Sequence, residues 1–246
     1  MFKIGVQVYS VRDDYAADVK QCLRKLKDIG YEGVELFGAL ANHPAEFLRD
    51  ALKEAGLECC GFHTRWEEFE TEEKIQFVVD YMKTLGCDYV IVPWMPEKTP
   101  EQWEEQIAAF NRLLERFRKE GLRFGFHAHK GEMYTLSNGR FAWDMIGEQT
   151  PEDFVMQVDI GNVLNGGREP IELYRKFASR GATVHYKAYS KEKGYDCAIG
   201  EDDIDWKTIV DISKNTPECE WIIVEKDAQD NYESITRSYH NLKKII

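Results

Sequence analysis

The chain has 246 residues, with 44 Asp and Glu against 32 Lys and Arg and a formal net charge of −12. Because phosphate groups are bound mainly by Lys and Arg, this acidic balance argues against a nucleic acid or an anionic membrane as a partner. The hydrophobic content of 43% is enough for a substantial core, in one large domain or two small ones.

Neither a signal peptide nor a membrane span is predicted. The first residues, MFKIG, contain no basic stretch followed by a long apolar run, and apolar runs stay short along the whole sequence. The six cysteines show no C-x-x-C spacing, which is the pattern of many metal and redox sites. We therefore expect a cytoplasmic protein whose cysteines are all reduced thiols.

Short apolar runs alternate with amphipathic helical segments from one end of the sequence to the other. The segment 14–29, for example, has Val19, Leu23 and Leu26 at helical spacing and ends before Gly30. Strands are expected at 3–8, 33–37, 57–63, 88–93, 122–129, 154–159, 182–187 and 220–226. Helices are expected at 14–29, 44–55, 72–85, 100–120, 141–148, 170–178, 206–214 and 232–244.

These eight strand–helix pairs follow one another without a linker or a change in composition, which favours one domain over residues 1–246. Such alternation favours parallel strands, and eight units of this size predict an α/β fold, a single (β/α)8 TIM barrel. A doubly wound open sheet is the alternative. It would usually have a glycine-rich turn after its first strand, and residues 8–13 contain no glycine.

Several of the expected strands end in residues that bind metals. Asp159, His185 and Glu225 follow three different apolar runs, and a barrel would bring the carboxyl ends of those strands to one mouth. Carboxylates and an imidazole suit Mn²⁺, Zn²⁺, Mg²⁺ or Co²⁺. Any one of the three alone is better explained as a capping or salt-bridging residue, but the three together favour one divalent-metal site.

A fourth ligand is left open between two residues. His127 and His129 share a face of the fifth strand because side chains two residues apart point the same way. Position favours His127, whereas charge favours Glu132 in the loop that follows. Alternatively, one histidine orients a neighbouring ligand through a hydrogen bond.

Other polar residues have both a chemical and a structural explanation. Lys187, two residues after His185, could stabilise a developing oxyanion or donate a proton, or it could form a salt bridge with Glu225 or Asp159. His63 could bind a substrate hydroxyl, or be an ordinary buried histidine.

The remaining candidates are aromatic or acidic. Trp94, like Trp66 and Trp206, could offer a flat face to a sugar ring, although packing in the core is the commoner role. Glu201 lies in the long connection 188–205, which suggests a functional loop, and it could reach a substrate or serve only near the next helix. Glu35 is either a structural acid at a strand end or a substrate contact.

Short motifs follow one another in a specific order. They are QVYSVRD at 7–13, GVEL at 33–36, VPW at 92–94, FHAHKGE at 126–132, VD at 158–159, VHYK at 184–187, IGE and IDW within 199–206, and VEKD at 224–227. In this order the chain resembles the xylose isomerase-like, sugar phosphate isomerase/epimerase superfamily of TIM barrels, nearly from end to end. The segment 126–132 resembles a His-x-His-x-x-Glu branch of that superfamily.

The resemblance implies a single divalent metal, with Mn²⁺ as the first choice, held at the ends of strands five to eight. Asp159, His185 and Glu225 match three of the ligand positions. In many epimerases of the superfamily the strand-five ligand is a glutamate, whereas here the position holds His127 with Glu132 nearby. Asn162 and Ala188 also stand where relatives often carry His and Asp, and these departures weigh against epimerisation by two glutamates.

The leading hypothesis is a metal-dependent isomerase or epimerase of a ketose, keto-sugar or inositol derivative. Glu225 or Glu132 would take the proton alpha to a carbonyl, and Lys187 or His63 would stabilise the charge that develops. His129, together with His63, Trp94 and Glu201, would bind the small sugar or polyol.

Two alternatives stay open. One is a lyase or dehydratase that acts on a 3-keto-glycoside or a keto-inositol, and the other is a non-catalytic barrel that binds a metal or a carbohydrate. The DNA-repair endonucleases of the superfamily are discounted because the chain is acidic and lacks the extra histidines of a multi-zinc cluster. The sequence leaves the sugar, any phosphate on it, the metal and the number of subunits open, a homo-oligomer included.

Overall fold

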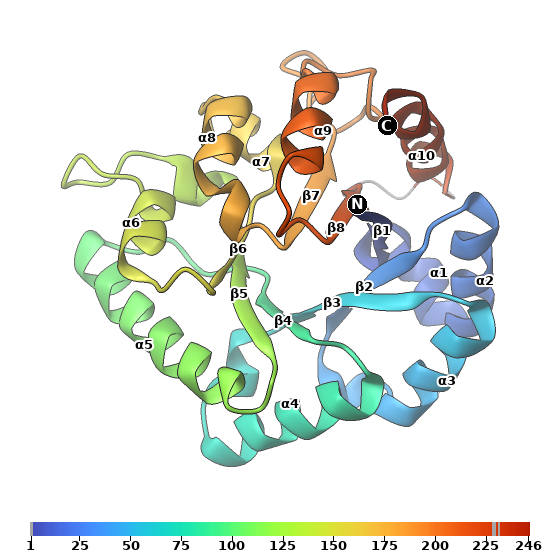
Figure 1. Ribbon diagram of the computed structural model, residues 1–246, viewed down its shortest axis with the longest axis horizontal. Coiled ribbons are helices and arrows are strands. Elements are labelled where there is room, and N and C mark those ends of the chain that lie inside the picture. The colour runs from blue at the N-terminus through green and yellow to red at the C-terminus, as the bar shows by residue number, and fades with distance from the viewer. Residues whose placement is uncertain (1, 228–229, 231) are drawn as a thin grey trace.

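In the computed structural model the strands form one parallel sheet that curls into a barrel (Figure 1). The structure describes residues 2–227, 230 and 232–246. Neighbouring strands follow the order β6-β5-β4-β3-β2-β1-β8-β7. Their bounds are β1 Lys3–Gln7, β2 Gly33–Gly38, β3 Glu58–Thr64, β4 Tyr89–Val92, β5 Arg123–His127, β6 Val155–Gln157, β7 Thr183–Lys187 and β8 Trp221–Glu225.

The residues that follow β6 join it to β7. Asp159 and His185 form an isolated parallel bridge, and the His185 backbone N–H donates to the Val158 carbonyl at 2.9 Å. The eight strands therefore form a nearly closed barrel, which confirms the predicted (β/α)8 TIM-barrel fold. The alternative of an open doubly wound sheet is wrong.

Helices surround the barrel on its outside (Figure 1). Their bounds are α1 Arg12–Ala17, α2 Val19–Ile29, α3 Ala45–Ala55, α4 Glu72–Leu85, α5 Pro100–Arg118, α6 Ala142–Gln149, α7 Ile160–Asn165, α8 Pro170–Phe177, α9 Trp206–Lys214 and α10 Glu233–Ile245. The longest, α5, starts with a reciprocal cap in which Thr99 and Gln102 each accept the other's backbone N–H. Pro100, which has no N–H to satisfy, takes the first helical position.

Two expected elements differ from the prediction. The helix expected at 14–29 is split, because Asp18 is extended with φ −155° and caps a second helix. The strand expected at 154–159 ends at Gln157, and Asp159 instead caps the short helix α7. The sequence did not predict α7, because six residues are too few for an apolar period to show.

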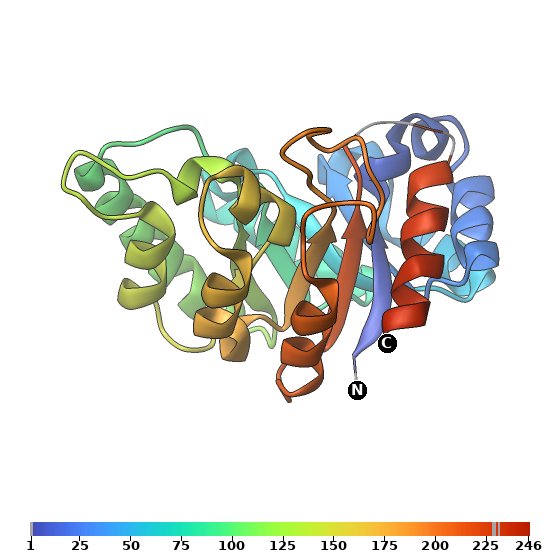
Figure 2. The same cartoon turned by 90° about the horizontal axis from the view of Figure 1, so that it is seen from above.

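The inside of the barrel has two chemically different layers. Where the strands begin, the interior side chains form a separate apolar cluster of Cys60, Tyr89, Ile91, Val155, Ala182, Trp221 and Ile223. Where the strands end, the buried side chains are polar or charged, namely Gln7, Glu35, His63, His127, Gln157, His185 and Lys187. Figure 2 shows the long connection 188–205 on the side toward which the strand arrows point.

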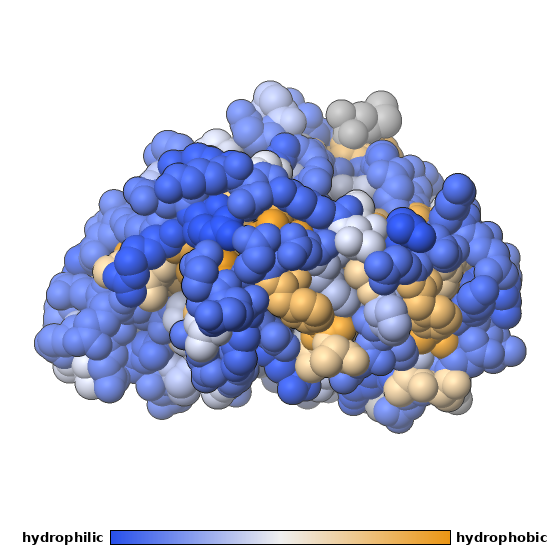
Figure 3. Space-filling view, turned by 90° about the horizontal axis from the view of Figure 1, so that it is seen from below, coloured by the Kyte–Doolittle hydropathy of each residue, from blue (hydrophilic) through white to orange (hydrophobic). Residues whose placement is uncertain are grey.

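The outer surface is mostly hydrophilic. Figure 3 shows one flank on which hydrophobic residues gather only in a few patches. None of the helices in the described ranges is long and apolar enough to cross a membrane. All six cysteines are free thiols, and five of them are buried.

Candidate metal centre

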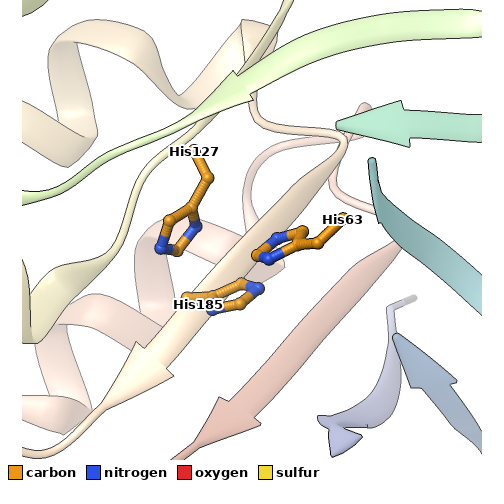
Figure 4. Close-up of side chains that lie close together, drawn as sticks. All are labelled: His63, His127 and His185. Carbon is orange, nitrogen blue, oxygen red and sulfur yellow. The ribbon is translucent and has the colours of Figure 1, made fainter. Parts of the chain in front are cut away.

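Three histidine rings meet where the strands end (Figure 4). The ring centroid of His127 lies 4.9 Å from that of His63 and 4.4 Å from that of His185. A second group shares His127 and His185 with the first and adds two carboxylates, those of Asp159 and Glu225. One ligand atom from each of these four residues lies within 4.8 Å of the others. The three ligands predicted first, Asp159, His185 and Glu225, are therefore close enough to contact one ion.

Asp159 is positioned by the start of α7. Its Oδ1 accepts the backbone N–H of Asn162 at 2.8 Å, and its Oδ2 accepts the side-chain amide of the same residue at 2.9 Å. The carboxyl group is fully buried, and this burial raises its pKa to about 7, although Lys187 and His185 oppose the shift. A carboxylate that is costly to ionise in the apo site is stabilised when a cation contacts it.

Gln157 determines which nitrogen of His127 faces Asp159. Gln157 Nε2 donates to Glu35 Oε1 and to Thr183 Oγ1, both at 2.8 Å, so its Oε1 must be the acceptor for His127 Nδ1 at 2.9 Å. Burial lowers the pKa of His127 well below its ordinary value, so the ring is neutral. Its only proton is on Nδ1, and Nε2, 3.7 Å from Asp159 Oδ2, is free to bind a cation.

His185 lies between two carboxylates. Its Nε2 is 2.6 Å from Glu35 Oε2 and its Nδ1 is 2.5 Å from Glu225 Oε2. Burial alone would lower its pKa, but Glu35 and Glu225 raise the pKa to about 10, so both nitrogens donate in the metal-free site. Because Glu35 retains the proton on Nε2, loss of the other proton leaves a lone pair on Nδ1 that faces Glu225.

His63 acts as a hydrogen-bond donor in this layer. Its Nε2 is 2.9 Å from Gln157 Oε1 and 3.0 Å from Glu35 Oε2, and both of these atoms are acceptors. Nε2 therefore carries a proton and would lose both contacts if it bound a metal. This favours the group with Asp159 and Glu225 over the group of three histidines as the ligand set.

Glu35 is the centre of this buried network, and its role was left open by the sequence. It also accepts Gln7 Nε2 at 2.7 Å. Burial would raise its pKa, but His63 and His185 hold the pKa well below its ordinary value. Space for the side chain comes from a bulge where β2 pairs with β3 and from Gly61, since a Cβ there would lie 2.6 Å from Glu35 Oε1. Glu35 therefore orients two histidines from beneath.

Lys187 is held by two carboxylates beside the group. Its Nζ donates to Asp227 Oδ1 at 2.7 Å and to Glu225 Oε1 at 3.2 Å. Burial would lower its pKa, but Glu225 and Asp159 raise the pKa, so the ammonium is charged. Burial would also raise the pKa of Glu225, but Lys187 and His185 hold it well below its ordinary value. The salt bridge with Glu225 is thus present, and Lys187 still lines a pocket.

This pocket has a volume of about 490 Å³, within the range of small-molecule sites. Its walls include the aromatic residues Tyr9, Phe37 and Trp94, and the Trp94 side chain is 58% exposed. His63 and His129 line it as well, so three of the residues predicted to bind substrate face this space. Burial lowers the pKa of His129 to about 4, which keeps its ring neutral.

The long connection 188–205 reaches the centre through Tyr195. The Tyr195 hydroxyl donates to Asn162 Oδ1 at 2.5 Å and accepts Asn165 Nδ2 at 2.8 Å. Its ring lies over Lys187, with Nζ 4.8 Å from the ring centroid. The loop therefore supports the residue that orients Asp159 and forms part of the pocket wall.

Two acids predicted from the sequence lie apart from the pocket. Glu132 is buried, accepts the His129 backbone N–H at 2.7 Å, and has a pKa raised to about 7 by burial. It belongs to neither ligand group found among the described residues, so the structure places His127, and not Glu132, beside Asp159. Glu201 pairs with Arg237 at 3.2 Å and is absent from the pocket wall as far as the structure describes it.

Sequence reasoning missed the residues that orient the ligands. Gln157 precedes Asp159 by two positions, and a glutamine inside an apolar strand was the available signal. Asn162 was noted only as a departure from relatives, and its role as the partner of Asp159 appears only in the structure. Tyr195 lies in a loop with no periodic pattern, so nothing in the sequence indicated it.

The donor set suits a divalent cation. Two carboxylates supply negative charge and two imidazoles supply directional nitrogens, a mixture that Mn²⁺, Zn²⁺ and Co²⁺ accept. In each of the two histidines, one ring nitrogen faces the other ligands and the second nitrogen donates to a buried acceptor. The acceptor is Gln157 for His127 and Glu35 for His185, and such a hydrogen bond is the usual support of a histidine ligand. The residues present therefore fit a metal ion.

Comparison with known proteins agrees with this architecture. Residues 23–244 match the family of xylose isomerase-like TIM barrels. The chain is 27% identical over 218 residues to an inosose dehydratase of Geobacillus kaustophilus, covering 76% of this chain and 69% of the relative.

Two solved structures show the same fold. A sugar phosphate isomerase/epimerase from Parabacteroides distasonis matches with a TM-score of 0.79 at 21% identity, covering 98% of both chains. A xylose isomerase-like TIM barrel protein from Mycobacterium smegmatis, in complex with magnesium, matches with a TM-score of 0.75 at 15% identity over 100% of this chain and 96% of that one.

Proposed function

The chain belongs to the xylose isomerase-like TIM barrel family, and from this membership we propose that it is a metal-dependent lyase acting on a cyclic polyhydroxy ketone. The reaction would remove water from a keto-inositol or the aglycone from a 3-keto-glycoside. The name of the Geobacillus relative, inosose dehydratase, supports the first of these substrates.

The carboxylates that line the pocket favour elimination over epimerisation. The carboxylates on the described pocket wall are Glu225 and Asp227, which lie two residues apart, and Asp227 is held by Lys187. The fifth strand supplies His127 in place of an acid, and its Nδ1 proton is committed to Gln157. Epimerisation by two carboxylates needs a base on each side of the substrate, whereas an elimination needs one base and a leaving group.

His127, Asp159, His185 and Glu225 would hold the metal, for which Mn²⁺ is our first choice. A divalent ion there would act as a Lewis acid on the substrate carbonyl and lower the cost of forming an enolate. Such an ion would also stabilise the ionised carboxylate of Asp159, which burial disfavours in the metal-free site.

The chain's own groups would carry the proton and position the ring. Glu225 takes the proton from the carbon alpha to the carbonyl, and the electron pair of that C–H bond forms the enolate. Collapse of the enolate to a carbon–carbon double bond breaks the bond to the beta oxygen, which takes the proton from Glu225 and leaves as water or an alcohol. Lys187, whose ammonium is 3.2 Å from Glu225 Oε1, stabilises the negative charge on the enolate oxygen. His63 and His129 bind hydroxyl groups, and Trp94 covers one face of the ring.

The test is product analysis in D₂O with the metal-loaded protein and two substrates, a keto-inositol and a methyl 3-ketoglucoside. We expect loss of water or of methanol together with an unsaturated ketone, and Glu225→Gln should abolish this loss. Deuterium uptake with the leaving group retained would contradict the lyase assignment.

An isomerase or epimerase is the second candidate. The same removal of a proton by Glu225 would be followed by its return to another carbon or to the other face. His129, which lines the pocket from the segment after β5, is the observation in its favour because it offers a second polar group beside the substrate. Metal binding without turnover of any ketone would instead support a non-catalytic barrel.

A further inference from the structure

Tyr195 links the long connection 188–205 to the ends of three strands. Its hydroxyl contacts Asn162 in α7, which follows β6, and its ring lies over Lys187 at the end of β7. Its backbone carbonyl accepts Nζ of Lys226, the residue that follows β8 and is only 4% exposed. Tyr195 is therefore fixed to the barrel by both its main chain and its side chain.

The partners of Asn162 determine the direction of the hydrogen bonds at the Tyr195 hydroxyl. Asn162 Nδ2 donates to Asp159 Oδ2 at 2.9 Å and to the Ala128 carbonyl at 3.0 Å. The other end of the amide, Asn162 Oδ1, must therefore accept the Tyr195 hydroxyl, which is 2.5 Å away. The hydroxyl oxygen in turn accepts Asn165 Nδ2 at 2.8 Å. The Tyr195 hydroxyl thus helps to fix which end of the Asn162 amide faces Asp159.

This amide contacts the Asp159 oxygen that faces the other ligands. Oδ1 accepts the backbone N–H of Asn162, whereas Oδ2 accepts the side-chain amide and lies 3.7 Å from His127 Nε2. A donor on Oδ2 holds the carboxylate in the orientation in which this oxygen faces His127. A reversed amide would place one acceptor against another and repel the same oxygen. The Tyr195 hydroxyl therefore supports the orientation of Asp159 that a metal ion needs.

The Tyr195 ring contacts a different group. Lys187 Nζ lies 4.8 Å from the ring centroid, within the range of a cation–π contact, and the same ammonium donates to Glu225 and Asp227. The ring makes this contact without its hydroxyl, whereas the bond to Asn162 needs the hydroxyl. Tyr195→Phe therefore removes one contact and keeps the other.

We propose that Tyr195 is a positioning residue whose hydroxyl couples metal binding to the attachment of the connection 188–205 at the barrel mouth. Coupling of this kind is reciprocal, so the attached connection raises the affinity for the metal and the bound metal strengthens the attachment by the same factor. Because Tyr195 lines the substrate pocket, metal binding completes the pocket wall, and the metal should bind before the substrate. This coupling rests on the metal site of the proposed function and not on the reaction.

Tyr195→Phe tests the first half of the coupling. Without the hydroxyl the Asn162 amide loses a donor that fixes it, so the affinity for Mn²⁺ should fall about tenfold, at the lower end of the range for groups that orient metal ligands. Competition with a chelating dye measures the affinity, and thermal melts check the fold. Tyr189→Phe is the matched control, because its ring packs on Tyr195 at 5.1 Å and its hydroxyl has no hydrogen-bond partner within the described ranges. This control should bind Mn²⁺ as the wild type does.

Limited proteolysis tests the second half. Lys191 and Lys193 are exposed within the connection and can be cut by a lysine-specific endoproteinase that needs no metal. Cleavage there follows the population of the detached connection, so saturating Mn²⁺ should slow it about tenfold in the wild type and in Tyr189→Phe, and less than about threefold in Tyr195→Phe. A hydroxyl that only stabilised the connection would change the rate equally with and without the metal.

Two results would overturn the coupling. One is an affinity for Mn²⁺ in Tyr195→Phe that stays within about twofold of the wild type. The other is protection by Mn²⁺ that is equal in this variant and in the wild type. Failure of the proposed lyase reaction looks different, because neither measurement involves turnover. It would appear as no loss of water or alcohol from either ketone, while both comparisons still give their answer.

Discussion

The two ends of the barrel interior are stabilised in different ways. Where the strands begin, Trp221 and its neighbours pack as an apolar cluster, and a Cβ on Gly33 would lie 2.7 Å from the Trp221 ring. Where the strands end, Glu35 and Gln157 join three histidines through hydrogen bonds. The first end can contribute stability through packing alone, whereas the second arranges charged groups that fit a cation.

The largest effect is expected from Glu225→Gln at the polar end. The change removes the proposed base and one anionic ligand, so turnover should fall by about 10³-fold or more. Steady-state kinetics with a saturating metal measures this loss, and circular dichroism checks that the fold is kept. Activity within tenfold of the wild type would contradict the role of Glu225.

Trp221→Ala is the matching change at the apolar end. Loss of the buried indole should lower the free energy of unfolding by about 3–5 kcal/mol. Because Trp221 lies four residues before Glu225 along β8, metal stoichiometry and turnover per folded molecule should stay close to those of the wild type. A loss of metal with unchanged stability would contradict the separation of the two ends.

Gln157→Leu tests whether the Gln157 side chain orients the metal ligands. Without the amide, His127 Nδ1 and His63 Nε2 lose a shared acceptor, so either tautomer of His127 becomes accessible. Affinity for Mn²⁺ should fall about 10–100-fold, as for other groups that orient metal ligands. Competition with a chelating dye measures the affinity for Mn²⁺. An unchanged affinity would show that Gln157 does not orient the metal ligands.

Metal removal should make stability depend on pH. In the metal-free protein His185 has a pKa of about 10 against an ordinary value of 6.5, so its contribution is complete below the ordinary value and is lost as pH rises toward 10. For Asp159, with a pKa of about 7 against 3.8, the cost of ionisation appears between these values. Both shifts lower stability as pH rises.

Thermal melts from about pH 7 to about pH 9 check this sign, because below about pH 6.5 the lowered pKa values of His127 and His129 have the opposite effect on stability. With a chelator the midpoint should fall across the range, and with Mn²⁺ it should fall less, because the ion replaces the protons as the partner of the carboxylates. Glu132 titrates in the same range, but it affects both forms alike. Parallel curves with and without metal would be inconsistent with a cation at these residues.

The smallest effect is expected outside the barrel, at the end where the strands begin. Lys3 and Glu58 are 2.6 Å apart, but both side chains are more than 40% exposed. Lys3→Ala should therefore change the free energy of unfolding by no more than about 1 kcal/mol and leave the metal affinity as it is. Chemical denaturation measures this change. A change larger than that would mean that the pair stabilises the protein more than an exposed ion pair is expected to.

The sequence predicted the elements whose signals are local. Alternating apolar runs located the eight strands, and the polar residues at their ends identified Asp159, His185 and Glu225 as neighbours although they lie far apart along the chain. The choice between His127 and Glu132 as the fourth ligand could be made only from the structure. It depends on the hydrogen bond between His127 and Gln157 and on the backbone N–H of His129, which donates to Glu132.

The role of Glu35 could not be predicted from the sequence either. Its position at a strand end was visible, but its partners His63 and His185 are separated from it by 28 and 150 positions in the sequence. Only closure of the barrel brings these groups together, and no local pattern records which of several strand-end acids will lie beneath the others.

The most direct test of the metal centre is anomalous diffraction from crystals of the protein equilibrated with Mn²⁺. We expect one peak about 2.0–2.6 Å from His127 Nε2, His185 Nδ1 and carboxylate oxygens of Asp159 and Glu225. A peak coordinated by Glu132 or by His63, or crystals with no peak at the end of the strands, would contradict the account.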